Sequence, residues 1–306
     1  MKIAARWHCL LLVLLLGGAS VAAVAEGARW TSSAQLVDGF VEVALHSVYS
    51  TRKSPVRKWT APVSYFIVHR VGDEQLHSQL IHTHFQHLAE ITGLTINSVA
   101  SPVAANFLVV LTKEGWLEAD LQHYYGADST LQHELLFRHS VCMVAFAAGR
   151  KGPIMRAVAI IPVDRARARG DLASCLVEEL THAVGLPNDS LKMFPSIFSR
   201  KSSHVYLTGL DHLMLRMLYD PRVKPGMDEK AVRPILQTIA AEYARDNRFA
   251  TAEQHAAEGG LAGFERSGLF SIMRRWRRGR AFCPPTDFPR RHHAAGCRGR
   301  TAPKPG

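Results

Sequence analysis

The order of apolar and polar positions predicts a strand, an amphipathic helix, several more strands and then a series of helices. Residues 63–68 form a β-rich run. The segment after it, which ends at Gly93, spaces its apolar residues along one helical face. Residues 113–140 are interpreted as an insertion with some helix. Further β-rich runs predict strands at residues 95–99, 107–111, 141–146 and 155–162.

Helical spacing returns in the second half of the chain and predicts helices at residues 172–184, 210–218 and 229–244. Residues 26–58 carry one short amphipathic stretch and are interpreted as a lead-in. From residue 247 to residue 306 the sequence becomes Ala/Gly-rich and then Arg-rich, which predicts a basic, poorly ordered tail. The folded domain is therefore expected to span residues 59–246 and to be of the α+β class.

Composition excludes two broad classes of protein. With 47% hydrophobic and 21% charged residues, the chain of 306 residues is neither disordered nor a multi-span membrane protein. The net charge of +11 lies mainly in residues 264–306, where 11 Lys or Arg face Glu265 and Asp287. The body is therefore balanced, and no specific nucleic-acid partner is expected. The Arg cluster around Trp276 could contact an anionic surface, and a solvated tail is the simpler alternative.

The first 25 residues have the pattern of a secretory signal peptide. Lys2 and Arg6 precede an apolar run, and Ala23-Val24-Ala25 forms a small-residue cleavage site. An uncleaved anchor is the alternative, because the apolar stretch could just reach across a bilayer. Cleavage predicts a secreted or periplasmic protein.

Four cysteines remain after the predicted cleavage site, an even number in a chain bound for an oxidising compartment. We expect disulfides between Cys142 and Cys175 and between Cys283 and Cys297, because each pair lies within one region. The alternative is that some of these thiols stay reduced and buried.

Residues 177–189, with the sequence VEELTHAVGLPND, contain the main candidate for chemistry. Glu178 and His182 share a helix face because they are four residues apart, and Glu179 flanks the same point. Gly185 can end the helix, so that one of the two polar residues after it, at 188 or 189, folds back. This is a candidate metal site with a general base, and a solvated helix face with an ion pair is the alternative.

The same stretch resembles the zinc-binding helix of metzincin metallopeptidases, H-E-x-x-H-x-x-G-x-x-H/D. The resemblance implies a zincin-like fold: a mixed β-sheet with a backing helix, an active-site-type helix and C-terminal helices. It implies that Glu179 is the catalytic glutamate, His182 a zinc ligand and Gly185 the turn glycine. The chain departs from the pattern at two ligand positions and at the methionine of the family's turn, which are occupied by Glu178, Asn188 and Ile197.

Asn188 is a poor substitute for a zinc-binding imidazole or carboxylate. Asp189 could replace it only if the chain after the turn glycine runs one residue longer than in the peptidases. The resulting site would be rich in oxygen donors and would prefer zinc less strongly than a three-His site.

A narrower set of motifs resembles the family called domain of unknown function 2927. The motifs are residues 178–189, 195–198 and 218–227, and Tyr219 lies in the last of them. Members of that family look like secreted or lipid-anchored proteins, which agrees with the signal pattern.

Three functions are compatible with these features. The first is a non-catalytic zincin relative that needs no cofactor and binds an envelope or secreted partner. The second is an atypical hydrolase dependent on zinc or another divalent metal, with Glu179 as the base. The third is a polyanion binder that acts through the basic tail.

A His cluster on the first predicted helix is expected to form a solvated face and not a metal site: His77, His82, His84 and His87.

Overall fold

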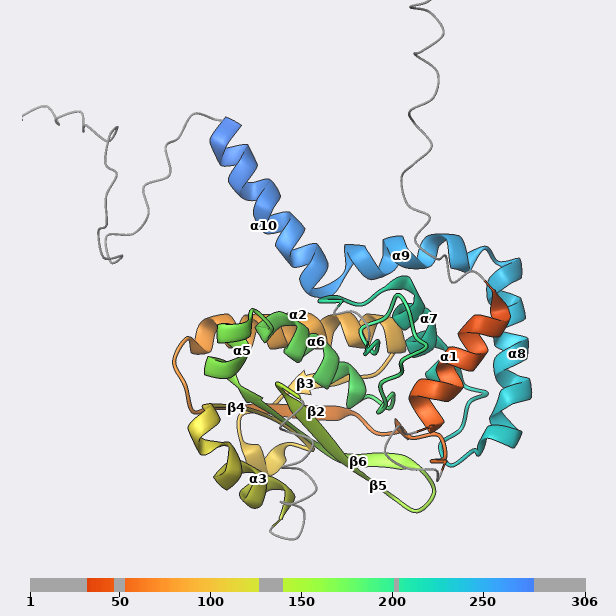
Figure 1. The fold of residues 1–306 in the computed structure, drawn as a ribbon, viewed down its shortest axis with the longest axis horizontal. Helices are drawn as coiled ribbons and strands as arrows, with labels where there is room; N and C mark the ends of the chain where they lie inside the picture. Colours follow the sequence, from red (N-terminus) through yellow and green to blue (C-terminus); the bar gives the residue numbers. More distant parts are fainter. Residues whose placement is uncertain (1–31, 47–52, 127–139, 201–203, 278–306) are drawn as a thin grey trace, which may run out of the picture. The chain divides into compact units, whose positions relative to one another are not determined.

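A computed structural model describes residues 32–46, 53–126, 140–200 and 204–277. Its described part contains one six-stranded sheet, with a parallel path in the order β1-β6-β4-β2-β3 and with β5 antiparallel to β6 (Figure 1). The strands are β1 Lys58–Trp59, β2 Val63–His69, β3 Ile96–Ser98, β4 Phe107–Thr112, β5 Met143–Ala148 and β6 Pro153–Pro162. The helices are α1 Ser33–Leu45, α2 Glu74–Thr92, α3 Leu117–Tyr125, α5 Val163–Arg169, α6 Leu172–His182, α7 Gly209–Leu218, α8 Glu229–Arg245, α9 Arg248–Glu258 and α10 Gly260–Arg277.

The two faces of the sheet carry two cores, because successive side chains of a strand point to opposite faces. Val109 and Ile161 belong to the larger core, which also contains buried residues of α2 and α6. Val110 and Ile160 belong to the smaller core under α3. The α+β class is therefore confirmed, with helices on both faces of a largely parallel sheet.

The expected lead-in was wrong, because α1 belongs to the main core. Its residues Leu36 and Phe40 are fully buried, and the helix packs against α7 and α8 (Figure 1). The helix begins at a capping box. The Ser32 hydroxyl accepts a hydrogen bond from the backbone N–H of Gln35, and the Gln35 side-chain oxygen accepts one from the backbone N–H of Ser32.

The expected start of a poorly ordered tail at residue 247 was also wrong for α9. This helix packs against α7 through Ala252 and Ala256, each 1% exposed. Alanine side chains permit close helix packing but give little contrast between apolar and polar faces, which is why the sequence pattern hid this helix. The Arg-rich residues 278–306 lie outside the described residues.

A disulfide between Cys142 and Cys175 confirms one predicted pairing. It joins the residue preceding β5 to the first turn of α6. Cys283, Cys297 and the predicted signal peptide lie outside the described residues. In the part of the chain that the structure describes, no helix is long and apolar enough to span a bilayer.

The expected solvated His face on α2 was wrong. His77, His84 and His87 are buried, because α2 packs against both α6 and α7. His84 hydrogen-bonds through Nε2 to the Thr181 hydroxyl at 3.0 Å, and half-buried His82 bonds to the Tyr65 hydroxyl.

Candidate functional site

Three predicted site residues come together at the C-terminal end of α6. His182 Nε2 lies 3.2 Å from Asp189 Oδ1 and 3.9 Å from Glu178 Oε1. Ligand atoms of these three residues all lie within 4.8 Å of one another. The helix accounts for the pairing of Glu178 with His182, and the chain reversal after the helix accounts for Asp189.

Gly185 makes that reversal possible. Its φ is +121°, a conformation that favours glycine, and a Cβ atom at this position would lie 2.1 Å from the Arg57 carbonyl oxygen. Both features are compatible with the turn role expected of Gly185.

Two aromatic side chains hold the carbonyl groups at the end of α6. Trp59 Nε1 donates to the Ala183 oxygen at 2.9 Å, and the Tyr219 hydroxyl donates to the Val184 oxygen at 2.8 Å. The same hydroxyl accepts from the Trp59 amide at 3.2 Å. Trp59 and Tyr219 therefore satisfy acceptors that the helix leaves open, and they fix the start of the turn.

Asn188 does not point into the site. Its backbone amide and its side-chain Nδ2 both donate to the Val43 carbonyl oxygen in α1, at 3.1 and 3.0 Å. This double contact ties the returning loop to α1 and leaves the next residue, Asp189, facing His182. The carboxylate beside His182 is therefore that of Asp189.

The orientation of the His182 ring is fixed from behind. Its Nδ1 lies 2.5 Å from the Leu186 carbonyl oxygen, which only accepts, so Nδ1 carries a proton and Nε2 faces the two carboxylates. The ring also packs on Phe198, with the centroids 4.8 Å apart.

Ile197, at the predicted turn position, lies in a segment that a buried carboxylate holds. The Ser196 hydroxyl donates to Asp211 Oδ1 at 2.6 Å, and the Ile197 amide donates to Oδ2 at 3.1 Å. Thr208 donates to the same carboxylate through both its amide and its hydroxyl. Asp211 thus positions the segment that contains Phe198, on which the His182 ring packs. The T-x-x-D spacing of Thr208 and Asp211 is the signal by which sequence reasoning could have found this network.

The acidic side chains of the site stabilise a positive charge on His182. Burial lowers the pKa of His182, but the hydrogen bond to Asp189 and the charges of Asp189, Glu179 and Glu178 raise it to about 10. Burial, followed by the charge of Glu178, raises the pKa of Glu179 to about 8. Burial raises the pKa of Glu178 as well. Without a metal, the carboxylates therefore stabilise a proton on His182, and a cation can replace that proton.

Glu179 connects this site to the edge of the sheet. Its side chain is 7% exposed and hydrogen-bonds to the backbone of Val144 in β5. Both flanking ligands are more open, with 36% of the Glu178 side chain and 32% of the Asp189 side chain exposed. Solvent can therefore reach the carboxylates.

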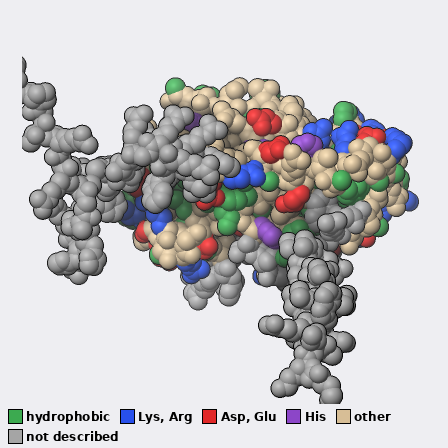
Figure 2. All heavy atoms as spheres, turned by 90° about the horizontal axis from the view of Figure 1, so that it is seen from above, with side chains coloured by type: hydrophobic (Ala, Val, Ile, Leu, Met, Phe, Trp, Pro, Cys, Tyr) green, Lys and Arg blue, Asp and Glu red, His purple; other side chains and the backbone are tan. Residues whose placement is uncertain are grey.

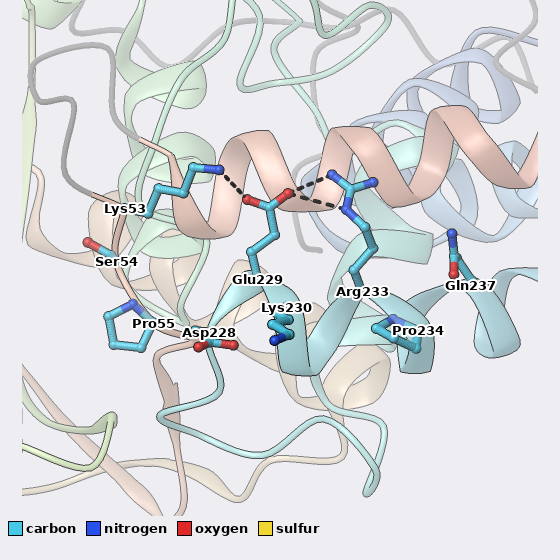
Figure 3. Close-up of a pocket in the computed structure, with 9 residues that line it drawn as sticks. All are labelled: Lys53, Ser54, Pro55, Asp228, Glu229, Lys230, Arg233, Pro234 and Gln237. Carbon is cyan, nitrogen blue, oxygen red and sulfur yellow. Dashed lines mark hydrogen bonds and ion pairs between the residues drawn. The ribbon is translucent and has the colours of Figure 1, made fainter.

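A cavity of about 640 Å³ at the start of α8 does not share these properties (Figure 3). Figure 3 shows Lys53 and Arg233 on opposite sides of Glu229, and both donate to its carboxylate. Those contacts, together with one from His46, lower the pKa of Glu229 to about 2. Lys53 and Arg233 neutralise the ionised Glu229, so this carboxylate is not available as a general base or a metal ligand. On the face drawn in Figure 2, acidic and basic side chains of the described residues are interspersed.

Comparison with known proteins agrees with the narrower set of motifs. The model of the family described as protein of unknown function, DUF2927, matches residues 33–238. That span starts at the first residue of α1 and ends within α8, and it includes the whole candidate site. No curated protein matches the chain. The chain belongs to the DUF2927 family.

Proposed function

We propose that this domain binds a divalent metal ion through Glu178, His182 and Asp189 and is a metal-dependent hydrolase with Glu179 as its general base. The observation that supports the proposal is the convergence of three ligand side chains within 4.8 Å beside a fourth, buried carboxyl group. The contact between Asp189 and His182 supports a hydrolase over a non-catalytic relative.

The chemistry of the donor set fits such an ion. Two carboxylates and one imidazole suit Zn²⁺ and also harder ions such as Mn²⁺. The contact from His182 Nδ1 to the Leu186 carbonyl is the kind of support that orients a metal-binding imidazole. The exposed parts of Glu178 and Asp189 leave room for a water molecule and a substrate.

Each residue then has a defined role. A bound divalent ion lowers the pKa of a coordinated water molecule and polarises a carbonyl group. Glu179 accepts the proton from the attacking water and passes it to the leaving group. Its raised pKa would fall when a cation binds beside it, which leaves the carboxylate ionised for this task.

The fold resemblance supports a peptide or related acyl substrate. The order of strand, helix, strands and active-site-type helix is the order that the metzincin resemblance implied. The Cys142–Cys175 disulfide supports an oxidising compartment, in line with the proposed secreted or periplasmic location.

Metal content and proton release test the proposal directly. At this site the untagged protein should bind close to one divalent ion per chain with release of protons, since His182 must lose its proton first. His182→Ala should lower the amount of bound metal by that one ion per chain, whereas Glu179→Gln should retain the metal but lose hydrolysis of a peptide library. The proposal would be overturned by protein that does not bind added Zn²⁺ or Mn²⁺, or by protein that binds the same number of ions per chain after His182→Ala.

Non-catalytic partner binding remains a second candidate, for which an exposed apolar group provides the specific observation. Leu191, Phe194 and Val205 are 53%, 47% and 39% exposed in the chain segment that follows Asp189. Such side chains are typical of contact with a polypeptide. In this case Phe194→Ser would weaken capture of an envelope or secreted polypeptide, and His182→Ala would leave capture unchanged.

A further inference from the structure

Three histidines from three helices line a pocket away from the candidate site. The pocket has a volume of about 400 Å³, and α7, which contributes to it, packs against both α2 and α9. His87 comes from α2, His212 from α7 and His255 from α9. The carboxylates of Glu90 and Glu258 also line the pocket.

The imidazoles have unused binding capacity. His212 is 8% exposed, and its buried Nδ1 has no hydrogen-bond partner among the described residues. Within the described ranges, the rings of His87 and His255 form no hydrogen bond either. A buried ring nitrogen without a partner is rare, and it indicates a missing water molecule or ligand.

Two of the three rings lie side by side, and the third lines the same pocket. The centroids of the His212 and His255 rings lie 5.8 Å apart. The His87 ring is pressed against the backbone after α9, because a Cβ at Gly259 or Gly260 would lie within 2.4 Å of a ring nitrogen. The pocket therefore brings imidazoles from α2, α7 and the end of α9 together around one space.

The protonation state suits metal ligation. Burial lowers the pKa of His87 to about 4. Burial and the charges of Arg216, His87 and His255 lower the pKa of His212 to about 4. Both rings are therefore neutral at pH 7, which is the form that binds a metal.

We propose that this pocket binds Zn²⁺ through His87, His212 and His255, with a carboxylate of Glu90 or Glu258 completing the shell. Imidazole-rich sites favour borderline ions such as Zn²⁺, in contrast to the oxygen-rich site on α6. Arg216 in the same pocket opposes a cation, and the two glutamates offset its charge.

Closure of this site requires His255 to move. Among the described residues, only the Glu178 group already has its donor atoms within 4.8 Å of one another. His255 lies on the exposed face of α9, so its side chain is free to rotate inward. A bound ion would tie α9 to α2 and α7.

The test uses the full chain with His182→Ala, so that the candidate site on α6 no longer contributes. Zn²⁺ titration against a chromophoric chelator should show one site per chain. Adding His255→Ala should weaken that site about tenfold or more. The matched control, His123→Ala, changes an exposed histidine on α3 and should leave the affinity unchanged. Co²⁺ bound to the His182→Ala chain should give visible absorption bands that His255→Ala removes.

Two results would overturn this inference: a His182→Ala chain that binds no Zn²⁺, or a Zn²⁺ affinity that does not change when His255→Ala is added. Failure of the hydrolase proposal would give a different result: the unaltered chain would bind no more metal than the His182→Ala chain.

Discussion

The Cys142–Cys175 disulfide should contribute a large share of the stability of this domain. It closes a loop with a sequence separation of 33 residues, which contains β5, β6, α5 and the first turn of α6. For a loop of that length, the lost entropy of the unfolded chain stabilises the folded state by about 3–4 kcal/mol. Both cysteines are buried, at 2% and 4% exposure, so the double change to alanine also removes packing contacts.

Equilibrium unfolding in urea, followed by tryptophan fluorescence, measures this contribution. The double variant Cys142→Ala/Cys175→Ala should lose about 3–4 kcal/mol of unfolding free energy, which corresponds to a fall of about 1–2 M in the urea midpoint. The unaltered protein with the same bond reduced should behave similarly. Cys283→Ala/Cys297→Ala is the matched control, since it removes the other cysteine pair.

A difference of less than about 1 kcal/mol in unfolding free energy between the double variant and the oxidised protein would refute this contribution. The bond also has a consequence for the site. The bond joins the helix that carries Glu179 to the strand whose Val144 backbone contacts that carboxyl group. Removal of the bond should therefore weaken metal binding as well as lower stability.

Three further outcomes are expected from the site and its supports. Gly185→Ala should lower the melting temperature and abolish metal binding at the site on α6, because the positive φ and the nearby backbone oxygen leave no room for a Cβ atom. Tyr219→Phe, which leaves the Val184 oxygen without its donor, should cost about 1–3 kcal/mol in urea unfolding. Burial lowers the pKa of His84 to about 3, so the unfolded chain binds more protons between pH 6.5 and 3. Stability should fall as the pH drops through that window, and His84→Gln should flatten the fall seen in unfolding curves.

Elements with strong local patterns could be predicted from the sequence. The strand β4 and the helix α6 lie where β-rich and helical spacing placed them, because each carries enough buried residues to show its period. β1 was missed because it has only two residues. α5 was missed because its sequence VDRARAR buries only Val163 and Ala166, which leaves no apolar stripe.

The edges of the domain could not be predicted from local pattern. α1 has a clear apolar face, but its place in the core depends on α8, which begins more than 180 residues later in the chain. The histidines of α2 show the same limit. A polar residue on a helix is exposed by default, and His84 becomes buried only because α6 supplies the Thr181 hydroxyl as its partner.

The identity of the third ligand illustrates why motif spacing alone could not settle the site. Counting residues after Gly185 favours position 188, because the peptidase pattern places its third ligand there. In this chain, position 188 is occupied by a residue with two donors, and the Val43 oxygen of α1, 145 positions away, accepts both. That contact turns Asn188 towards α1 and Asp189 towards His182, so the ligand set depends on how α1 packs. Asn188→Ala should then weaken metal binding without removing a ligand, and Asp189→Asn should weaken it more. Equal metal affinity in the Asn188→Ala and unaltered proteins would show that α1 does not position the ligand.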